Sequence, residues 1–174
     1  MKSKKYLCLL VTLSAALCCK AVDKKEVVLL ADGVAYSVTY YSGESGCHVR
    51  NKSNKLYRIS GDSLAQCLST VKEVGISVKD IIKQLYSKEK IEQLAGKKAT
   101  VGCIMHCNSS GDVLEVFFML HNACIDELTL AKIKEMEDLF KAKYKLKFKF
   151  SPVCPQERKY YRLTTGLKFS QCMD

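Results

Sequence analysis

Cysteine and histidine residues gather in one short part of the chain, where they could bind a metal ion. The cluster spans 22 residues and consists of Cys103, His106, Cys107, His121 and Cys124. Thiolate sulfur and imidazole nitrogen are the usual ligands of a tetrahedral zinc site. A metal interpretation would bring three or four of these side chains to one ion.

The elements expected around these residues oppose that interpretation. Apolar residues alternate on both sides of the polar segment 108–112, which predicts a β-hairpin with its turn there. Cys107 then lies beside the turn, whereas His121 lies about 26 Å away at about 3.3 Å per residue. His106 points to the opposite face from Cys103 and Cys107. We therefore expect these two thiols to behave as small buried apolar groups, and we predict no metal and no cofactor.

Other catalytic arrangements are weaker. Cys47 and His48 could form a nucleophile–base pair, but neighbours in a strand point to opposite faces. The sequence has no HExxH motif, no nucleophile elbow and no phosphate-binding glycine loop. Glu135 and Glu137 are interpreted as solvated partners of Lys132, Lys134 and Lys141. We predict that the protein is not an enzyme, and a thiol- or metal-dependent enzyme remains the alternative.

Lysine alternates with large apolar residues in the segment KAKYKLKFKF, residues 141–150. A period of two gathers each set of side chains on one face of a β-strand. We expect the aromatic face to pack against a helix. The opposite face would then present a row of ammonium groups to water: Lys143, Lys145, Lys147 and Lys149.

This lysine row has two interpretations. It can be a solvated face, since lysine hinders aggregation at sheet edges. It can also be a binding face for an anionic glycan, a phosphorylated lipid or an acidic envelope protein, with charges repeating at about 7 Å. Arg158, Lys159, Arg162 and Lys168 could extend it.

The first part of the chain after residue 22 is expected to contain short strands. Asp32-Gly33 lies between two apolar runs and predicts a β-hairpin. Residues 43–55 are expected to form a loop, and residues 56–60 a short strand.

Cap residues predict the helices that follow. Ser63 and Gln66 form a capping box, and together with Gly75 they predict a helix over 63–75. Ser77 is expected to cap the next helix, with a break near Lys88-Glu89 and an end at Gly96. These elements form a helical segment over 61–96.

From residue 97 the expected order is β-β-α-β-β. The hairpin is followed by an amphipathic helix over 129–143, capped by Thr129 or Asp126, by the strand 144–150 and by a last strand over 160–169. The predicted fold class is therefore α+β: an antiparallel sheet packed by one main helix, preceded by a β-hairpin region (22–60) and the helical segment. Residues 22–174 are expected to form one compact unit.

The N-terminal residues 1–21 resemble a secretory signal peptide. A basic start is followed by the apolar run YLCLLVTLSAALCC and an abrupt polar segment. The run is shorter than the roughly 20 residues of a membrane span. We predict export with cleavage after Ala21. An uncleaved anchor and lipidation of Cys19, with membrane association only if lipidated, remain alternatives.

Removal of residues 1–21 would leave 24 basic and 18 acidic residues, a net charge of +6, and seven cysteines. This moderate charge favours anionic surfaces, and an exported protein is not expected to bind nucleic acid. Export permits disulfides, and an odd number of cysteines leaves at least one thiol outside an intrachain pair.

The segment MHCNSSGDVLEVFF and the elements after it resemble the C-terminal domain family of TonB proteins. Met105 and Cys107 hold the alternating apolar positions, Asn108 and Gly111 the turn, and the return strand begins at Val113. The helix TLAKIKEMEDLF and the strand YKLKFKF follow in the family's order, so that the resemblance covers about residues 97–169. The family's Pro-rich spacer and Tyr-Pro motif do not occur in this sequence.

The resemblance implies a small exported, extracytoplasmic protein that binds an extended peptide by adding it to a sheet edge. Combined with the lysine row, it predicts a non-catalytic binding protein of the cell envelope, periplasmic or associated with the outer membrane. The expected partner is an envelope protein or an anionic glycan or lipid. An envelope lipoprotein with a structural role is the alternative.

Overall fold

The computed structural model describes residues 24–41, 46–58, 68–121, 124, 130–150 and 160–173. These residues form two antiparallel sheets and three α-helices, which confirms the α+β class. None of the helices in these ranges is long and apolar enough to cross a membrane.

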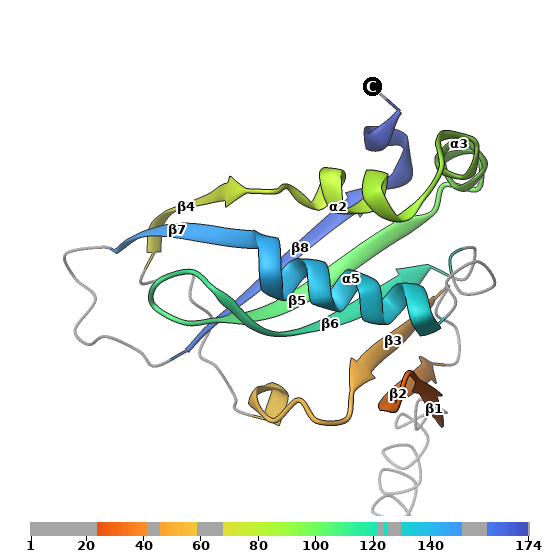
Figure 1. Ribbon diagram of the computed structural model, residues 1–174, viewed down its shortest axis with the longest axis horizontal. Coiled ribbons are helices and arrows are strands. Elements are labelled where there is room, and N and C mark those ends of the chain that lie inside the picture. Colours follow the sequence, from red (N-terminus) through yellow and green to blue (C-terminus); the bar gives the residue numbers. More distant parts are fainter. Residues whose placement is uncertain are drawn as a thin grey trace, which may run out of the picture.

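The larger sheet has six strands in the order β1-β2-β3-β6-β5-β8, and every neighbouring pair is antiparallel. Its edges are therefore β1 and β8 (Figure 1). The strand bounds are β1 Lys24–Ala31, β2 Val34–Tyr41, β3 Gly46–Asn51, β5 Thr100–Cys107, β6 Val113–His121 and β8 Tyr161–Lys168.

The three helices, a two-stranded ribbon and the C-terminal turn cover one face of this sheet. The helix α5, Leu130–Lys143, lies across the sheet, and its last residue is followed directly by β7, Tyr144–Phe150 (Figure 1). The strand β7 pairs with β4, Leu68–Gly75, to form a separate two-stranded ribbon. The same layer contains α2 (Val78–Leu85), α3 (Lys88–Gly96) and the C-terminal 3-10 turn η3 (Phe169–Cys172).

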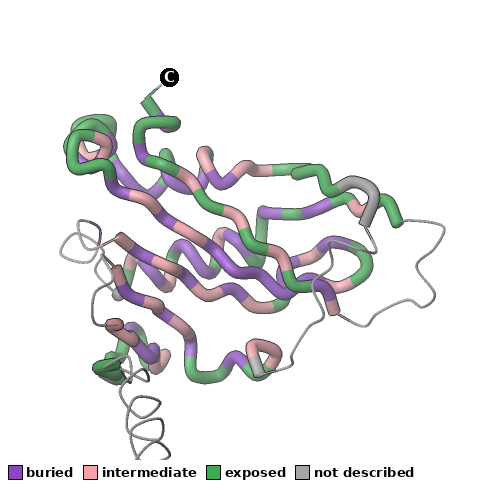
Figure 2. Tube along the Cα trace, turned by 180° about the vertical axis from the view of Figure 1, so that it is seen from behind, coloured by how far each residue is buried: buried purple, intermediate pink, exposed green. Residues whose placement is uncertain are grey.

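The core lies between the two layers. Buried residues alternate with less buried ones along β3 and β6, and the burial colours in Figure 2 show this pattern. Phe118 of β6 contacts Phe140 of α5, and Phe140 contacts Tyr144 of β7, with ring centroids 6.0 and 5.2 Å apart. Each fully buried large side chain contributes roughly 2 kcal/mol. The core therefore ties α5 and the ribbon to the sheet.

Several sequence predictions are confirmed. Asp32 and Gly33, both with positive φ, form the turn between β1 and β2. Ser77 caps α2 through a complete capping box with Asp80. The hairpin with its turn at 108–112, the helix that ends at Lys143 and the extended strand 144–150 all occur as expected.

The helix expected over 63–75 is wrong where the structure describes it, because residues 68–75 form the strand β4. Two β-branched valines, Val71 and Val74, favour this conformation, and the pairing with β7 outweighs the helical spacing. Ser63 and Gln66, the expected cap, lie outside the described residues.

Two further expectations are wrong. The expected loop 43–55 contains β3, which lies between β2 and β6 and buries Cys47 and Val49 on the core face. The short strand expected over 56–60 begins instead as a 3-10 turn, η1, Leu56–Arg58. The strand β3 has only six residues, and only every second side chain faces the core. Its polar-rich segment therefore contains no apolar run that would predict a strand.

The topology also differs from one sheet formed by β-β-α-β-β. The strand β7 does not join β5, β6 and β8, because it belongs to the ribbon with β4. Period-two alternation predicted the strand but could not specify its partner, which lies some 70 residues away in the chain.

Glu137 was expected to be solvated, but this residue of α5 is buried between the helix and the sheet. Its carboxylate accepts hydrogen bonds from the Tyr36 hydroxyl at 2.6 Å and from the Asn51 amide at 3.1 Å, and it forms an ion pair with Lys141 at 2.6 Å. Burial, followed by the hydrogen bond to Glu137, raises the pKa of Tyr36. The carboxylate thus fastens α5 to β2 and β3. Glu135, by contrast, is exposed.

We predict that Glu137→Ala lowers the free energy of unfolding by about 3 kcal/mol, because it leaves the buried Tyr36 and Asn51 donors without their acceptor. Urea denaturation measures the effect. The control Glu135→Ala, on the exposed side of the same helix, should change stability by less than about 0.5 kcal/mol. Equal effects of the two variants would contradict the role given to Glu137.

Candidate functional site

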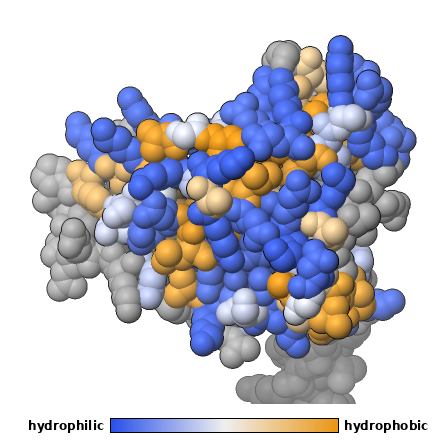
Figure 3. Space-filling model, in the orientation of Figure 1, coloured by the Kyte–Doolittle hydropathy of each residue, from blue (hydrophilic) through white to orange (hydrophobic). Residues whose placement is uncertain are grey.

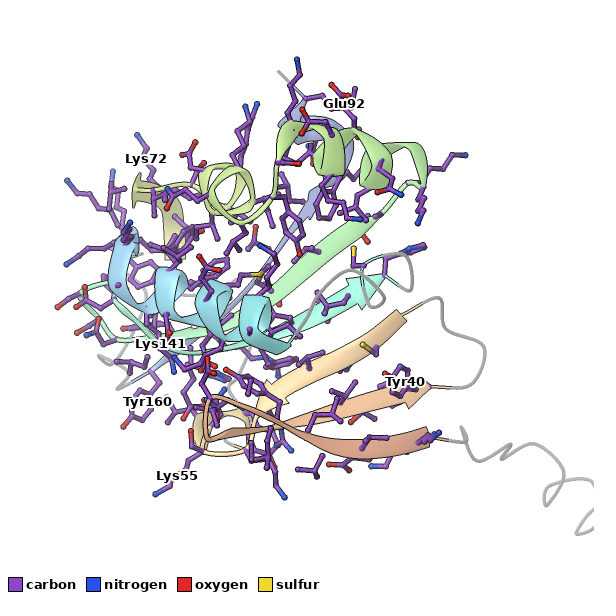
Figure 4. The ribbon with its side chains drawn as sticks, turned by 45° about the vertical axis from the view of Figure 1, so that its right-hand side comes forward. Tyr40, Lys55, Lys72, Glu92, Lys141 and Tyr160 are labelled. Carbon is purple, nitrogen blue, oxygen red and sulfur yellow. The ribbon has the colours of Figure 1, made fainter. Side chains whose placement is uncertain are left out.

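The outward face of the β4–β7 ribbon carries the predicted lysines. Lys145, Lys147 and Lys149 lie on alternate positions of β7, and all three are exposed. Across the ribbon, Lys147 pairs directly with Lys72 of β4, which also points outward (Figure 4). We call these four lysines the ribbon lysines. They form a cationic face made by two strands instead of one.

Lys143 was expected to belong to the lysine row. It is instead the last residue of α5 and does not belong to β7. Its carbonyl oxygen accepts a hydrogen bond from the backbone of Ile76, at the end of β4. Lys72, which no sequence pattern singled out, takes a place on the face. Only the pairing of β4 with β7 reveals it.

Like charges stand directly opposite each other on the ribbon. A cross-strand Lys–Lys pair is destabilising. Among the described residues, no carboxylate forms an ion pair with Lys72 or Lys147. An exposed valine, Val74, lies opposite Lys145 on the same face. Figure 3 shows hydrophilic side chains projecting around apolar patches where β4 and β7 lie.

The turn of the β5–β6 hairpin holds β7 in place. The Leu146 N–H donates to the Gly111 carbonyl at 2.9 Å, and Lys145 forms an ion pair with Asp112 at 2.8 Å. The Lys145 ammonium is the main cause of the lowered pKa of Asp112, and the Asn108 side chain adds to it. Gly111 has φ of +83°, and a Cβ there would lie 1.7 Å from the Leu146 carbonyl oxygen.

The inner face of the ribbon is apolar and anchors it to the sheet. Tyr144 and Leu146 are buried, and the Tyr144 hydroxyl donates to Glu73 of β4 at 2.7 Å. Further along, Phe148 contacts Tyr161 of β8 with ring centroids 5.3 Å apart. Phe150, at the end of β7, is 37% exposed, so the inward packing weakens there. These contacts turn the lysines away from the sheet.

Two of the basic residues expected to extend the lysine row do not belong to this face. Arg162 and Lys168 lie at exposed positions of β8, on the side of the six-stranded sheet opposite α5. Arg158 and Lys159 lie outside the described residues, as does Cys19, the possible lipidation site.

The cysteine–histidine cluster is not brought together. Cys103 and Cys107 are fully buried in the core, as predicted, whereas His106 faces the other side of the sheet between Glu115 and Arg162. Within the described ranges, no group of three or more His, Cys, Asp or Glu side chains is arranged to hold a metal ion.

The described thiols are poorly suited to nucleophilic chemistry. Burial raises the pKa of Cys47 and Cys124 to about 11 and that of Cys107 to about 12, and it raises the pKa of Cys103 as well. His48, the expected base for Cys47, faces the opposite side of the sheet and contacts the Tyr41 ring at 4.9 Å. His48 therefore cannot act as the base that activates Cys47.

A shallow hollow of about 630 Å³ lies on the side of the sheet opposite α5. Gly102 and Gly166, which pair across β5 and β8, form its floor. Its lining includes Met119, Thr164, Lys168 and Gln171. The hollow is on the other side of the sheet from the ribbon lysines, so it does not form one site with them.

Comparisons with known proteins support the fold. No family model matches the sequence, and no curated protein matches it. Among solved structures, the chain is similar to a DUF5043 family protein from Bacteroides uniformis ATCC 8492, with a TM-score of 0.55 and 18% identity. The similarity covers 83% of this chain and 84% of that chain. It extends over most of the molecule and concerns the arrangement of the elements alone.

We predict that Gly111→Ala destabilises the protein by at least about 2 kcal/mol more than Gly33→Ala. Both glycines have positive φ, so both substitutions impose similar backbone strain. Only at Gly111 does the new methyl group collide with the β7 backbone, since nothing lies within 4 Å of a Cβ at Gly33. Thermal or urea unfolding measures the difference, and equal losses would show that the turn does not hold β7.

We also predict that the thiols of Cys47, Cys103, Cys107 and Cys124 react roughly 100-fold more slowly with iodoacetamide at pH 8 than in the unfolded chain, because only the thiolate is nucleophilic. Peptide mass mapping before and after urea treatment measures each site. Because the pKa of these thiols is higher in the folded state than in the unfolded state, the protonated thiols contribute to the stability of the fold. This contribution is fully present below about pH 8.5. This stability should be lost as the pH rises toward 11 and 12. Rapid native labelling would contradict the buried placement.

Proposed function

We propose that the protein is an exported, non-catalytic binding protein of the cell envelope that holds an anionic partner on the ribbon lysines. The observation that carries this proposal is the direct Lys72–Lys147 pair, with Lys145 and Lys149 beside it. The two ammonium groups repel each other in the free protein and lower its stability. An anion that bridges them removes this repulsion, so its binding stabilises the protein.

The chemistry of the face favours a partner with several negative charges. The lysines of β7 recur about 7 Å apart, so a single small anion would leave most of them unmatched. A phosphorylated glycolipid, an anionic polysaccharide or an acidic segment of an envelope protein would match them. The exposed Val74 among the lysines would contact apolar parts of such a partner.

The signal-like residues 1–21 support export, and the resemblance to TonB C-terminal domains supports a role in the envelope. By analogy with that family, an extended peptide could also add to a free edge of the six-stranded sheet. Intact mass of the exported protein distinguishes cleavage after Ala21 from a lipid on Cys19, which would favour the lipoprotein alternative. A thiol enzyme would have to expose one of the buried thiols described above.

We predict that a triple variant, Lys72→Glu, Lys147→Glu and Lys149→Glu, weakens binding to anionic phospholipid vesicles and to a sulfated polysaccharide resin. The loss should be at least about tenfold at low salt, since each lysine near an anionic surface contributes about 1 kcal/mol. Lys145 is kept because it holds Asp112. Vesicle sedimentation and the salt concentration at elution measure the effect.

The matched control is Lys88→Glu, Lys97→Glu and Lys98→Glu, which makes the same change in net charge near α3, away from the ribbon (Figure 1). A general effect of charge would weaken both variants equally, and that outcome would overturn the proposed site. Retained binding of the ribbon variant to an envelope extract would direct the search to a sheet edge instead.

A further inference from the structure

The two edges of the six-stranded sheet differ in chemistry. The strand β1 has eight residues, and from Val27 to Ala31 it carries no charge. Val28, Leu29 and Leu30 are 49%, 37% and 71% exposed, respectively. On the outer edge of such a strand, alternate backbone N–H and C=O groups point away from β2 and can pair with another strand.

The other edge strand, β8, has features that oppose such pairing. Arg162 and Lys168 place charges at its two ends, and Gly166 lies between them. The 3-10 turn η3 follows directly at one end, and Phe148 and Phe150 contact Tyr161 at the other. Charged residues and flanking structure are the usual protection of a sheet edge. β1 carries no charged residue over its last five positions, and no other described strand pairs with its outer edge.

We propose that β1 pairs with β1 of a second copy of this chain, antiparallel and across a two-fold axis perpendicular to the sheet. A self-complementary edge is the simplest partner for an exposed strand, because a two-fold axis applies the same surface twice and closes the assembly. The proposal is independent of the proposed function, because it uses none of the ribbon lysines.

Charge selects the register of this pairing. With Val28 at the axis, Val27 lies opposite Leu29 of the other copy, and Lys24 of each copy lies level with Asp32 of the other. Both Lys24 and Asp32 are exposed. A register centred on Leu29 would bring Glu26 level with Asp32, two like charges. A register centred on Val27 would place Lys24, Lys25 and Glu26 opposite apolar residues and would form no ion pair. The Val28 register also sets Glu26 opposite Leu30, but of the three registers it alone pairs opposite charges, Lys24 with Asp32, twice across the axis.

A perpendicular two-fold axis keeps both helical layers on the same side of one continuous sheet. The ribbons of the two copies would then face the same direction from opposite ends of the dimer. If the proposed function holds, a surface with many anionic groups would engage both ribbons at once, and the second contact would be intramolecular.

The first test is the mass of the naturally processed, purified protein in solution, measured by sedimentation at micromolar concentrations. We expect twice the mass of one chain. The double variant Val28→Lys and Leu30→Lys should sediment as a monomer with an unchanged circular dichroism spectrum, because both side chains are exposed. The matched control Val71→Lys and Val74→Lys alters two exposed valines of β4 and should remain dimeric.

The second test locates the axis with single cysteine substitutions at Val27, Val28 and Leu29, followed by mild oxidation. Directly opposite residues of antiparallel strands have Cβ atoms about 5 Å apart, close enough for a disulfide after a small adjustment. Val28→Cys should therefore cross-link to its own copy several-fold faster than the other two variants, with unsubstituted protein as the background.

A monomeric protein at all concentrations would overturn the proposal. So would a dimer that survives the Val28→Lys and Leu30→Lys change or that cross-links at none of the three positions. Preferential cross-linking at Val27 or Leu29 would overturn the charge-selected register. None of these outcomes depends on anion binding, so the dimer and the proposed function can fail separately.

Discussion

The burial of Tyr144 and Leu146 against the sheet is the constraint on which the rest of the structure depends. Tyr144 immediately follows the last residue of α5, so the helix and β7 have no linker in which to reorient. Once both side chains face the core, the period of two turns the intervening lysines outward. The hydrogen bond between Leu146 and Gly111 then fixes the height of β7 above the β5–β6 turn. The cationic face is thus a geometric consequence of the core.

The same constraint explains why the ribbon is separate from the main sheet. A strand that leaves the end of α5 starts in the helical layer, and there it can reach β4 but not the edge of β5 that β8 occupies. The Glu137 carboxylate, held by Tyr36 and Asn51, fixes the other side of α5 over β2 and β3. The helix is therefore held at two places: by the hydrogen bonds of Glu137, and by the burial of Tyr144 and Leu146 just after its last residue. Its position determines where the ribbon lies.

Local patterns in the sequence predicted what local physics determines. Alternation in 144–150, the Asp32-Gly33 turn and the Ser77 cap each depend on neighbouring residues, and each prediction is confirmed. Long-range pairing was not accessible in this way. Nothing near Glu137 shows that Tyr36, 101 residues away, would bury it, and nothing near Lys72 shows that Lys147 would lie opposite. The candidate site was therefore predicted as one strand of lysines, and the second strand came from the structure.

The most direct measurement of the central claim is lysine footprinting of the protein bound to anionic phospholipid vesicles. Acetylation of each lysine is followed by mass spectrometry with and without vesicles, at low and high salt. Our account predicts protection of Lys72, Lys147 and Lys149 that disappears at high salt, with Lys88 and Lys97 unaffected. Equal labelling of all five lysines in the bound and free protein would contradict it.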